Sequence, residues 1–267
     1  MLVDSLIDVG RYDLSDDALA ADCHRRLVRE GVCVLPGFVT PEAVTALVAE
    51  SDHLAPMAHR SSTTASPYLA PIDDSFAPGH PRRTISASSV EVVAYDLFPS
   101  HSALRWLYES DALLDFVRRC LGLDVLHRYA DPFGALNLAI MREGDRLGWH
   151  FDMTDFVVSI AIQSSTVGGD FENAQQIRGH DDENYDGVGE VLDGGGRVRT
   201  EPMTPGTLML FNGRWSMHRV TEIRGPRPRY VALLAYDTEP GTDSSETLKL
   251  SRYGRLPVGA PTKGVES

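Results

Sequence analysis

Two histidines and one aspartate in this sequence are of the residue types that bind a metal ion. His150 and Asp152 stand two positions apart in a segment with strand character. Alternate residues of an extended chain project to the same side, so this imidazole and this carboxylate could share one metal. His218 follows on a later β-type run, far enough along the chain to return as another strand. Two nitrogen ligands and one hard oxygen ligand suit Fe(II) and leave coordination positions open.

Neither part of this set is specific by itself. A lone His-x-Asp pair is often a surface hydrogen bond, and a lone strand histidine is often a core residue bonded within the sheet. The order of His150, Asp152 and His218, and their place on β-type runs, make the joint pattern more specific than its parts.

An arginine further along the chain could complete a site for an acidic cosubstrate. Arg229 opens an alternating apolar run over residues 229–237, which predicts a strand close to the one that carries His218. Its guanidinium could form two parallel hydrogen bonds with the far carboxylate of a dicarboxylate. Arg227 lies two positions earlier, so on an extended chain it would point to the same side, and it is the competing candidate for this role. The alternative interpretation of Arg229 is a surface charge at the edge of a strand.

The first part of the chain, residues 1–122, is predicted to be mostly helical. Apolar residues at helical spacing, with Thr40 and Pro41 as a typical helix start and Gly31 and Gly122 as stops, delimit the helices. The predicted helices cover residues 15–30, 40–53, 102–109 and 111–120, with a short β-type run over 32–38. Residues 55–83 are dense in Ser, Thr, Pro and Asp, so we predict a long loop there.

After Gly122 the pattern changes to short β-type runs separated by Gly, Pro and Asp. These runs cover residues 125–130, 134–141, 155–163, 170–177, 206–212, 217–223 and 229–237. Such a series predicts a sandwich or barrel, interrupted at 180–196 by an acidic insertion with a short helix. We therefore predict one domain over residues 1–267, with the β core at 123–240 and a C-terminal tail at 241–267.

Composition limits the partners. The 267 residues carry a net charge of −13 without any Lys/Arg-rich run, which argues against nucleic acid and favours a small-molecule substrate. No stretch reaches the roughly 18 apolar residues of a membrane span, and the N-terminus lacks the basic flank of a signal peptide. The distant Cys23, Cys33 and Cys120 are typical of reduced, buried thiols, so we expect a cytoplasmic protein.

In this order, the residues His150, Asp152, His218 and Arg229 resemble the HxD…H…R motif of the Fe(II)/2-oxoglutarate oxygenase superfamily. The similarity extends over roughly residues 20–240. Segments such as EGDRLGWHFDMTDF, GGDFENAQQIR and TPGTLMLFNGRWSMHRVT look like the branch that contains halogenases of free amino acids and their hydroxylase relatives. The resemblance implies an α+β fold, a double-stranded β-helix of the cupin-like jelly-roll type with N-terminal helices.

The resemblance also implies roles for particular residues. His150, Asp152 and His218 would bind Fe(II), while 2-oxoglutarate would chelate the iron and pair with Arg229, leaving a position for O2. The halogenases carry a small residue where Asp152 stands, so hydroxylation is the expected reaction.

The resemblance points to substrate-binding residues as well. The segment around Arg82 and Arg83 resembles the one that supplies a substrate-carboxylate arginine in that branch, although two solvated loop cations are an equal alternative. Asn137, on a strand flanking the His-x-Asp segment, could line the pocket or face outward.

The expected function is hydroxylation of an unactivated carbon of a free amino acid or derivative in specialised metabolism, with succinate and CO2 as coproducts. A carrier-bound or peptide substrate, and desaturation or cyclisation, are alternatives within the same cofactor chemistry. A jelly roll that binds a metal or a sugar without redox chemistry is the alternative of another class. The oligomeric state is open, with a homodimer among the options.

Overall fold

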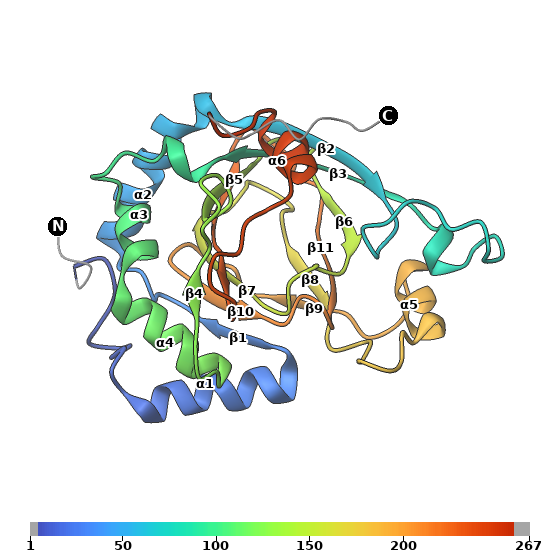
Figure 1. Ribbon diagram of the computed structural model, residues 1–267, viewed down its shortest axis with the longest axis horizontal. Coiled ribbons are helices and arrows are strands. Elements are labelled where there is room, and N and C mark those ends of the chain that lie inside the picture. Colours follow the sequence, from blue (N-terminus) through green and yellow to red (C-terminus); the bar gives the residue numbers. More distant parts are fainter. Residues whose placement is uncertain (1–4, 259–267) are drawn as a thin grey trace.

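Two facing β-sheets form the centre of the structure, and helices cover the outer face of the larger sheet (Figure 1). The computed structural model describes residues 5–258. The larger sheet contains, in spatial order, β1 (Val32–Leu35), β10 (Leu208–Phe211), β7 (Val157–Gln163), β12 (Arg229–Leu234), β5 (Leu136–Met141), β3 (Ser86–Val93) and β2 (His59–Ala65). The smaller sheet contains β6 (Leu147–His150), β11 (Met217–Val220), β8 (Phe171–Ala174) and β9 (Arg199–Glu201). These antiparallel sheets confirm the predicted jelly roll.

The N-terminal helices begin and end at the residues that the sequence indicates. They are α1 (Asp17–Glu30), α2 (Pro41–Leu54), α3 (Ala103–Glu109) and α4 (Asp111–Leu121). The Thr40 hydroxyl accepts a hydrogen bond from the backbone N–H of Ala43, which caps α2. Gly31 and Gly122 end α1 and α4 in the left-handed conformation that glycine adopts without strain. None of the helices within the described range is long and apolar enough to cross a membrane.

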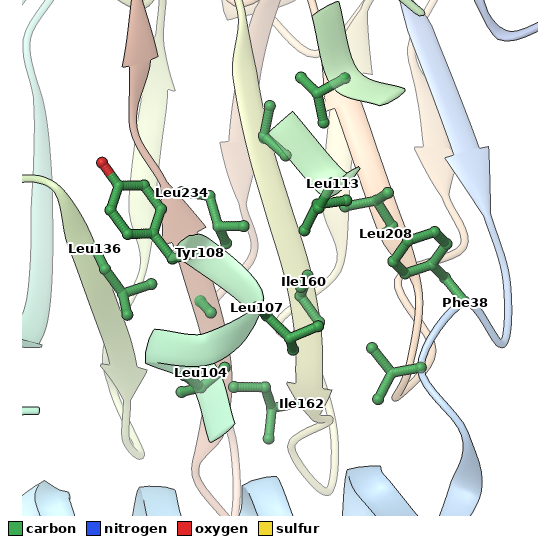
Figure 2. Close-up of a cluster of buried hydrophobic side chains, with 14 of the residues drawn as sticks. Phe38, Leu104, Leu107, Tyr108, Leu113, Leu136, Ile160, Ile162, Leu208 and Leu234 are labelled. Atoms are coloured by element: carbon green, nitrogen blue, oxygen red, sulfur yellow. The ribbon is translucent and has the colours of Figure 1, made fainter. Parts of the chain in front are cut away.

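The helices and the larger sheet share one hydrophobic core. Figure 2 shows Leu104, Leu107 and Tyr108 of α3 packed over the sheet, beside Leu136 and Ile160. Successive side chains of a strand point to opposite faces of the sheet. The neighbours of these helix-facing residues on each strand therefore point into the space between the two sheets. The shared core supports our proposal that the helical part and the β part form one domain.

The long loop predicted over residues 55–83 is wrong in its first part. This segment contains β2, which pairs antiparallel with β3 along its whole length, and β3 in turn pairs with β5. Both strands are rich in Ser and Thr and only partly buried, so they lack the apolar alternation from which strands are predicted. The part of the chain before residue 122 is therefore less purely helical than expected.

The remaining elements are short. They are η2 (Ala55–Met57), η3 (Pro81–Arg83), η4 (Tyr95–Leu97), β4 (His127–Arg128), α5 (Tyr185–Leu192), β13 (Tyr236–Asp237) and α6 (Glu246–Tyr253). The helix α5 confirms the short helix expected in the acidic insertion. By contrast, α6 was not predicted; it lies in the expected tail 241–267, of which residues 259–267 fall outside the described range.

The three cysteines are free and buried, as predicted. Cys23 lies on α1, Cys33 on β1 and Cys120 on α4, so all three belong to the core between the helices and the larger sheet.

Candidate metal centre and cosubstrate pocket

The smaller sheet brings the three predicted metal ligands together. His150 ends β6 and His218 lies directly opposite it on the antiparallel neighbour β11. Asp152 follows two residues after His150, and its carboxylate oxygens lie 3.7 Å from Nε2 of His150 and 3.4 Å from Nε2 of His218. One ligand atom from each residue lies within 4.8 Å of the others, a spacing that could hold one metal ion.

Backbone contacts fix Asp152 after its strand has ended. Its N–H donates to the carbonyl of Gly213 at 3.0 Å, and the N–H of Phe151 donates to the carbonyl of Pro67 at 2.8 Å. A Cβ atom on Gly213 would overlap with the Asp152 carboxylate, so only glycine leaves room for this ligand. The turn before β11 therefore shapes the site as much as the strand that carries the first histidine.

We expect Gly213→Ala to weaken metal binding about 10- to 100-fold without unfolding the protein, because the added methyl group displaces the Asp152 carboxylate. Anaerobic Fe(II) titration compares the variant with wild type. Gly179→Ala is the matched control, since a Cβ there meets no atom within 4 Å. Equal metal affinity in Gly213→Ala and wild type would contradict this account of the turn.

The hydrogen bonds of the two imidazoles leave their Nε2 atoms free for a metal. Nδ1 of His150 lies 2.8 Å from the carbonyl of Gly148, and Nδ1 of His218 lies 3.0 Å from the carbonyl of Ser216. A carbonyl only accepts, so each Nδ1 carries the hydrogen and each Nε2 presents a lone pair. Burial lowers the pKa of His218 to about 4, an effect that the nearby Asp152 opposes, and the ring is therefore neutral at neutral pH.

The Asp152 carboxylate shows that this set fits a cation. Its Oδ2 atom is buried and has no hydrogen-bond partner, because the facing Nε2 atom of His218 carries no hydrogen. A buried carboxylate oxygen without a donor is costly, and a divalent cation between Asp152 and the two imidazoles would satisfy it. Two imidazoles and one carboxylate, with the remaining side open, are the donor set that suits non-haem Fe(II).

A cavity of about 180 Å³ lies between the two sheets beside these ligands. His150, Asp152 and His218 line it together with Arg229, which opens β12 and is only 8% exposed. Burial lowers the pKa of Arg229 to about 10, so its guanidinium remains charged at neutral pH. Within residues 5–258 this cation forms no ion pair, and its Nη1 atom contacts only the Met141 sulfur at 3.9 Å. The cavity can therefore receive an anion.

The structure distinguishes between Arg227 and Arg229, the two candidates for binding the far carboxylate of the cosubstrate. Arg227 is exposed in the turn before β12 and does not line the cavity, whereas Arg229 faces it. Arg229 is therefore the better placed of the two for a dicarboxylate.

Arg82 and Arg83 do not line the metal cavity. Arg82 donates to the Tyr185 hydroxyl at 2.9 Å and lies over the ring of Tyr68. Arg83 pairs with the exposed Asp74 at 2.9 Å. Both guanidinium groups are thus engaged with other parts of the chain, and a role for either in substrate binding stays a prediction.

Asn137 lies on the same face of β5 as Ala139 and Met141, which line the metal cavity, but it does not line that cavity itself, and its amide is used within the protein. Its Nδ2 donates to the carbonyls of Phe133 and Leu136, and its Oδ1 accepts from the Tyr253 hydroxyl at 2.9 Å. Asn137 therefore supports the wall of the pocket, and direct contact with a substrate stays a prediction.

Two further residues line the cavity that the sequence did not single out. Ser159 on β7 is 3% exposed, and its hydroxyl has no hydrogen-bond partner, so it can donate to a ligand in the cavity; it lies opposite Leu233, four residues along β12 from Arg229. The sequence feature that could have identified Ser159 is its single hydroxyl within the β-type, largely apolar run 155–163. Arg252 belongs to α6, for which the sequence gave no strong pattern.

The fold is that of known iron-dependent oxygenases. A 2OG-Fe(II) oxygenase family oxidoreductase from Burkholderia pseudomallei is 16% identical, with a TM-score of 0.53 over 84% of this chain and 92% of that chain. The epimerase SnoN of nogalamycin biosynthesis, solved with Fe3+, alpha ketoglutarate and nogalamycin RO, is 15% identical, with a TM-score of 0.56 over 83% and 84%. The carbocyclase SnoK of the same biosynthesis is 15% identical, with a TM-score of 0.57 over 91% and 93%.

At such identities these structures establish the fold and not the reaction. No curated protein matches the sequence. A family model described as Halogenase D, however, matches residues 15–251, which is most of the chain and includes every candidate metal ligand. The resemblance inferred from the motifs is therefore confirmed: the chain has the Fe(II)/2-oxoglutarate oxygenase fold and belongs to the Halogenase D family.

Proposed function

We propose that this chain is an Fe(II)/2-oxoglutarate-dependent dioxygenase that hydroxylates an unactivated carbon of a free amino acid or an amino-acid derivative. One observation carries the proposal: a histidine, aspartate and histidine set and a buried, unpaired arginine line the same cavity. The first set suits Fe(II), and the arginine suits the far carboxylate of a dicarboxylate cosubstrate.

The residues of the chain have separate tasks in this proposal. His150, Asp152 and His218 would hold Fe(II), which when bound supplies the activation of O2 coupled to decarboxylation of 2-oxoglutarate. Arg229 would bind and orient the far carboxylate of the cosubstrate between the sheets. The apolar walls of the cavity would exclude water from the reacting groups.

Asp152 favours hydroxylation over halogenation, although the chain belongs to the Halogenase D family. The backbone N–H of Asp152 donates to the carbonyl of Gly213, and the carboxylate lies against the same glycine, so it occupies the position that a halide would need. Substrate placement, which these ligands do not determine, decides between hydroxylation and outcomes such as desaturation or cyclisation.

We expect product formation to be independent of chloride. The measurement is mass spectrometry of products formed from a panel of free amino acids, with succinate release assayed in chloride-free and chloride-containing buffer. Addition of one oxygen atom in both buffers is the expected result. A chlorinated main product that disappears without chloride would contradict the hydroxylase assignment.

The small-molecule substrate and a reducing compartment fit the rest of the chain. The charge of −13 does not suit a phosphate backbone, and the three free, buried cysteines suit the cytoplasm. A comparison of free and carrier-loaded amino acids would separate the proposed substrate from a carrier-bound one.

A further inference from the structure

A second cavity, of about 240 Å³, adjoins the metal cavity. Val157, Leu233 and Arg252 line both, so the two cavities share a wall. The second cavity reaches from the ends of β5, β7 and β12 to the helix α6. The two cavities are therefore neighbours, and Arg252 lies at the boundary between them.

The helix α6 is fixed to the barrel on both sides of Arg252. Lys249 is 4% exposed and donates to Asp243 and to the carbonyl of Ser244, while the buried Asp131 lies 3.9 Å from its ammonium group. The Tyr253 hydroxyl donates to Asn137 at 2.9 Å. The helix also packs beside β2 and β3 (Figure 1). Arg252 is therefore presented to the cavities from a rigid element.

Arg252 has no carboxylate partner. Within residues 5–258 its guanidinium forms no ion pair, whereas the next arginine, Arg255, pairs with Asp96 at 2.7 Å. Burial raises the pKa of Tyr253, and the charge of Arg252 and the hydrogen bond with Asn137 oppose that rise. Arg252, Tyr253 and Asn137 thus form a polar corner of the second cavity.

Two arginines with separate positions suggest two carboxylates. Arg229 lies 8% exposed at the far end of β12, deep between the sheets, whereas Arg252 lies where the cavities meet. Resting on the function proposed above, we propose that Arg252 binds the carboxylate of the substrate, a free α-amino acid whose aliphatic body lies along Val157 and Leu233, which also line the metal cavity. Arg252 is then a substrate-binding residue that the sequence did not identify, and it differs from Arg82 and Arg83.

The test measures binding and not turnover. Wild-type protein, loaded anaerobically with Fe(II) and 2-oxoglutarate, is screened by thermal unfolding against the twenty protein L-amino acids. Each amino acid that raises the unfolding temperature is then titrated calorimetrically, together with its carboxamide, which lacks the carboxylate. We expect an aliphatic amino acid to bind and its carboxamide not to bind.

The variants locate the carboxylate contact. Arg252→Gln should lower the affinity for the amino acid about 10- to 100-fold, which is the effect of losing hydrogen bonds between charged groups. Arg252→Lys should restore part of that affinity. Arg255→Gln is the matched control, because its ion pair with Asp96 lies on the surface, and it should leave the affinity unchanged. The 2-oxoglutarate affinity, measured from the visible absorption of its iron chelate, should be the same in all of these proteins.

Several results would overturn the assignment of Arg252. One is that no amino acid raises the unfolding temperature of the wild type, and another is that a carboxamide binds as tightly as its amino acid. The others concern Arg252→Gln: an unchanged affinity for the amino acid, or a lower affinity for 2-oxoglutarate in place of a lower affinity for the amino acid. The failure of the proposed function has a different signature: the iron chelate absorption would be missing from the wild type itself.

Discussion

Asp152→Asn is expected to slow succinate release at least about 100-fold, the upper end of the effect of changes around a metal site. The amide has nearly the shape of the carboxylate, so the fit against Gly213 is kept while the negative charge is lost. A neutral amide is a poor ligand for a divalent cation and cannot offset the charge of the metal. The rate is measured at saturating 2-oxoglutarate, with bound iron determined in the same samples.

Asp155→Asn is the matched control for this change. Asp155 lies three residues further on, is exposed, and pairs with Arg214 on the surface. Its replacement should leave both iron content and rate near the wild-type values. If Asp152→Asn kept a rate close to wild type, Asp152 would not be a metal ligand and the assignment of the centre would be wrong.

Arg229→Gln is expected to lower the affinity for 2-oxoglutarate about 100-fold, since charge-assisted hydrogen bonds to a carboxylate contribute up to about 3 kcal/mol. Fe(II) binding without the cosubstrate should not change, because Arg229 does not contact the ligands. The free energy of unfolding of the unloaded protein should not fall, since an unpaired buried charge is costly to keep. Titration of the iron chelate and denaturant unfolding measure the two quantities.

Arg227→Gln is the control variant, because Arg227 lies two residues before Arg229 in the sequence but is exposed, outside β12. Its cosubstrate affinity should match the wild type. A silent Arg229→Gln together with a weakened Arg227→Gln would reverse the assignment of the cosubstrate arginine.

The three candidate metal ligands could be identified from the sequence because the patterns that mark them are local. His150 and Asp152 are placed by the alternation of an extended chain, and His218 lies in a short β-type run. The structure brings these segments together by the antiparallel pairing of β6 and β11, with His150 opposite His218. The four N-terminal helices could be predicted for the same reason, since their caps and apolar spacing involve residues that are close together in the sequence.

The parts that could not be predicted depend on tertiary contacts. The strands β2 and β3 lack apolar alternation because they extend the sheet at a partly exposed edge. Ser159 and Arg252 acquire a role only through the cavity that several distant elements enclose. The role of Gly213 arises from the space that Asp152 occupies, and the sequence shows only one glycine in a turn.

The central claim is that these residues form an iron and 2-oxoglutarate site, and an anaerobic titration tests it most directly. The metal-free protein is titrated with Fe(II) and 2-oxoglutarate while the weak visible charge-transfer band of the chelate is followed. A band that saturates at one equivalent and is lost in His218→Ala is the predicted result. The absence of a band at any concentration would contradict the oxygenase assignment and favour a jelly roll that binds a metal or a sugar without redox chemistry.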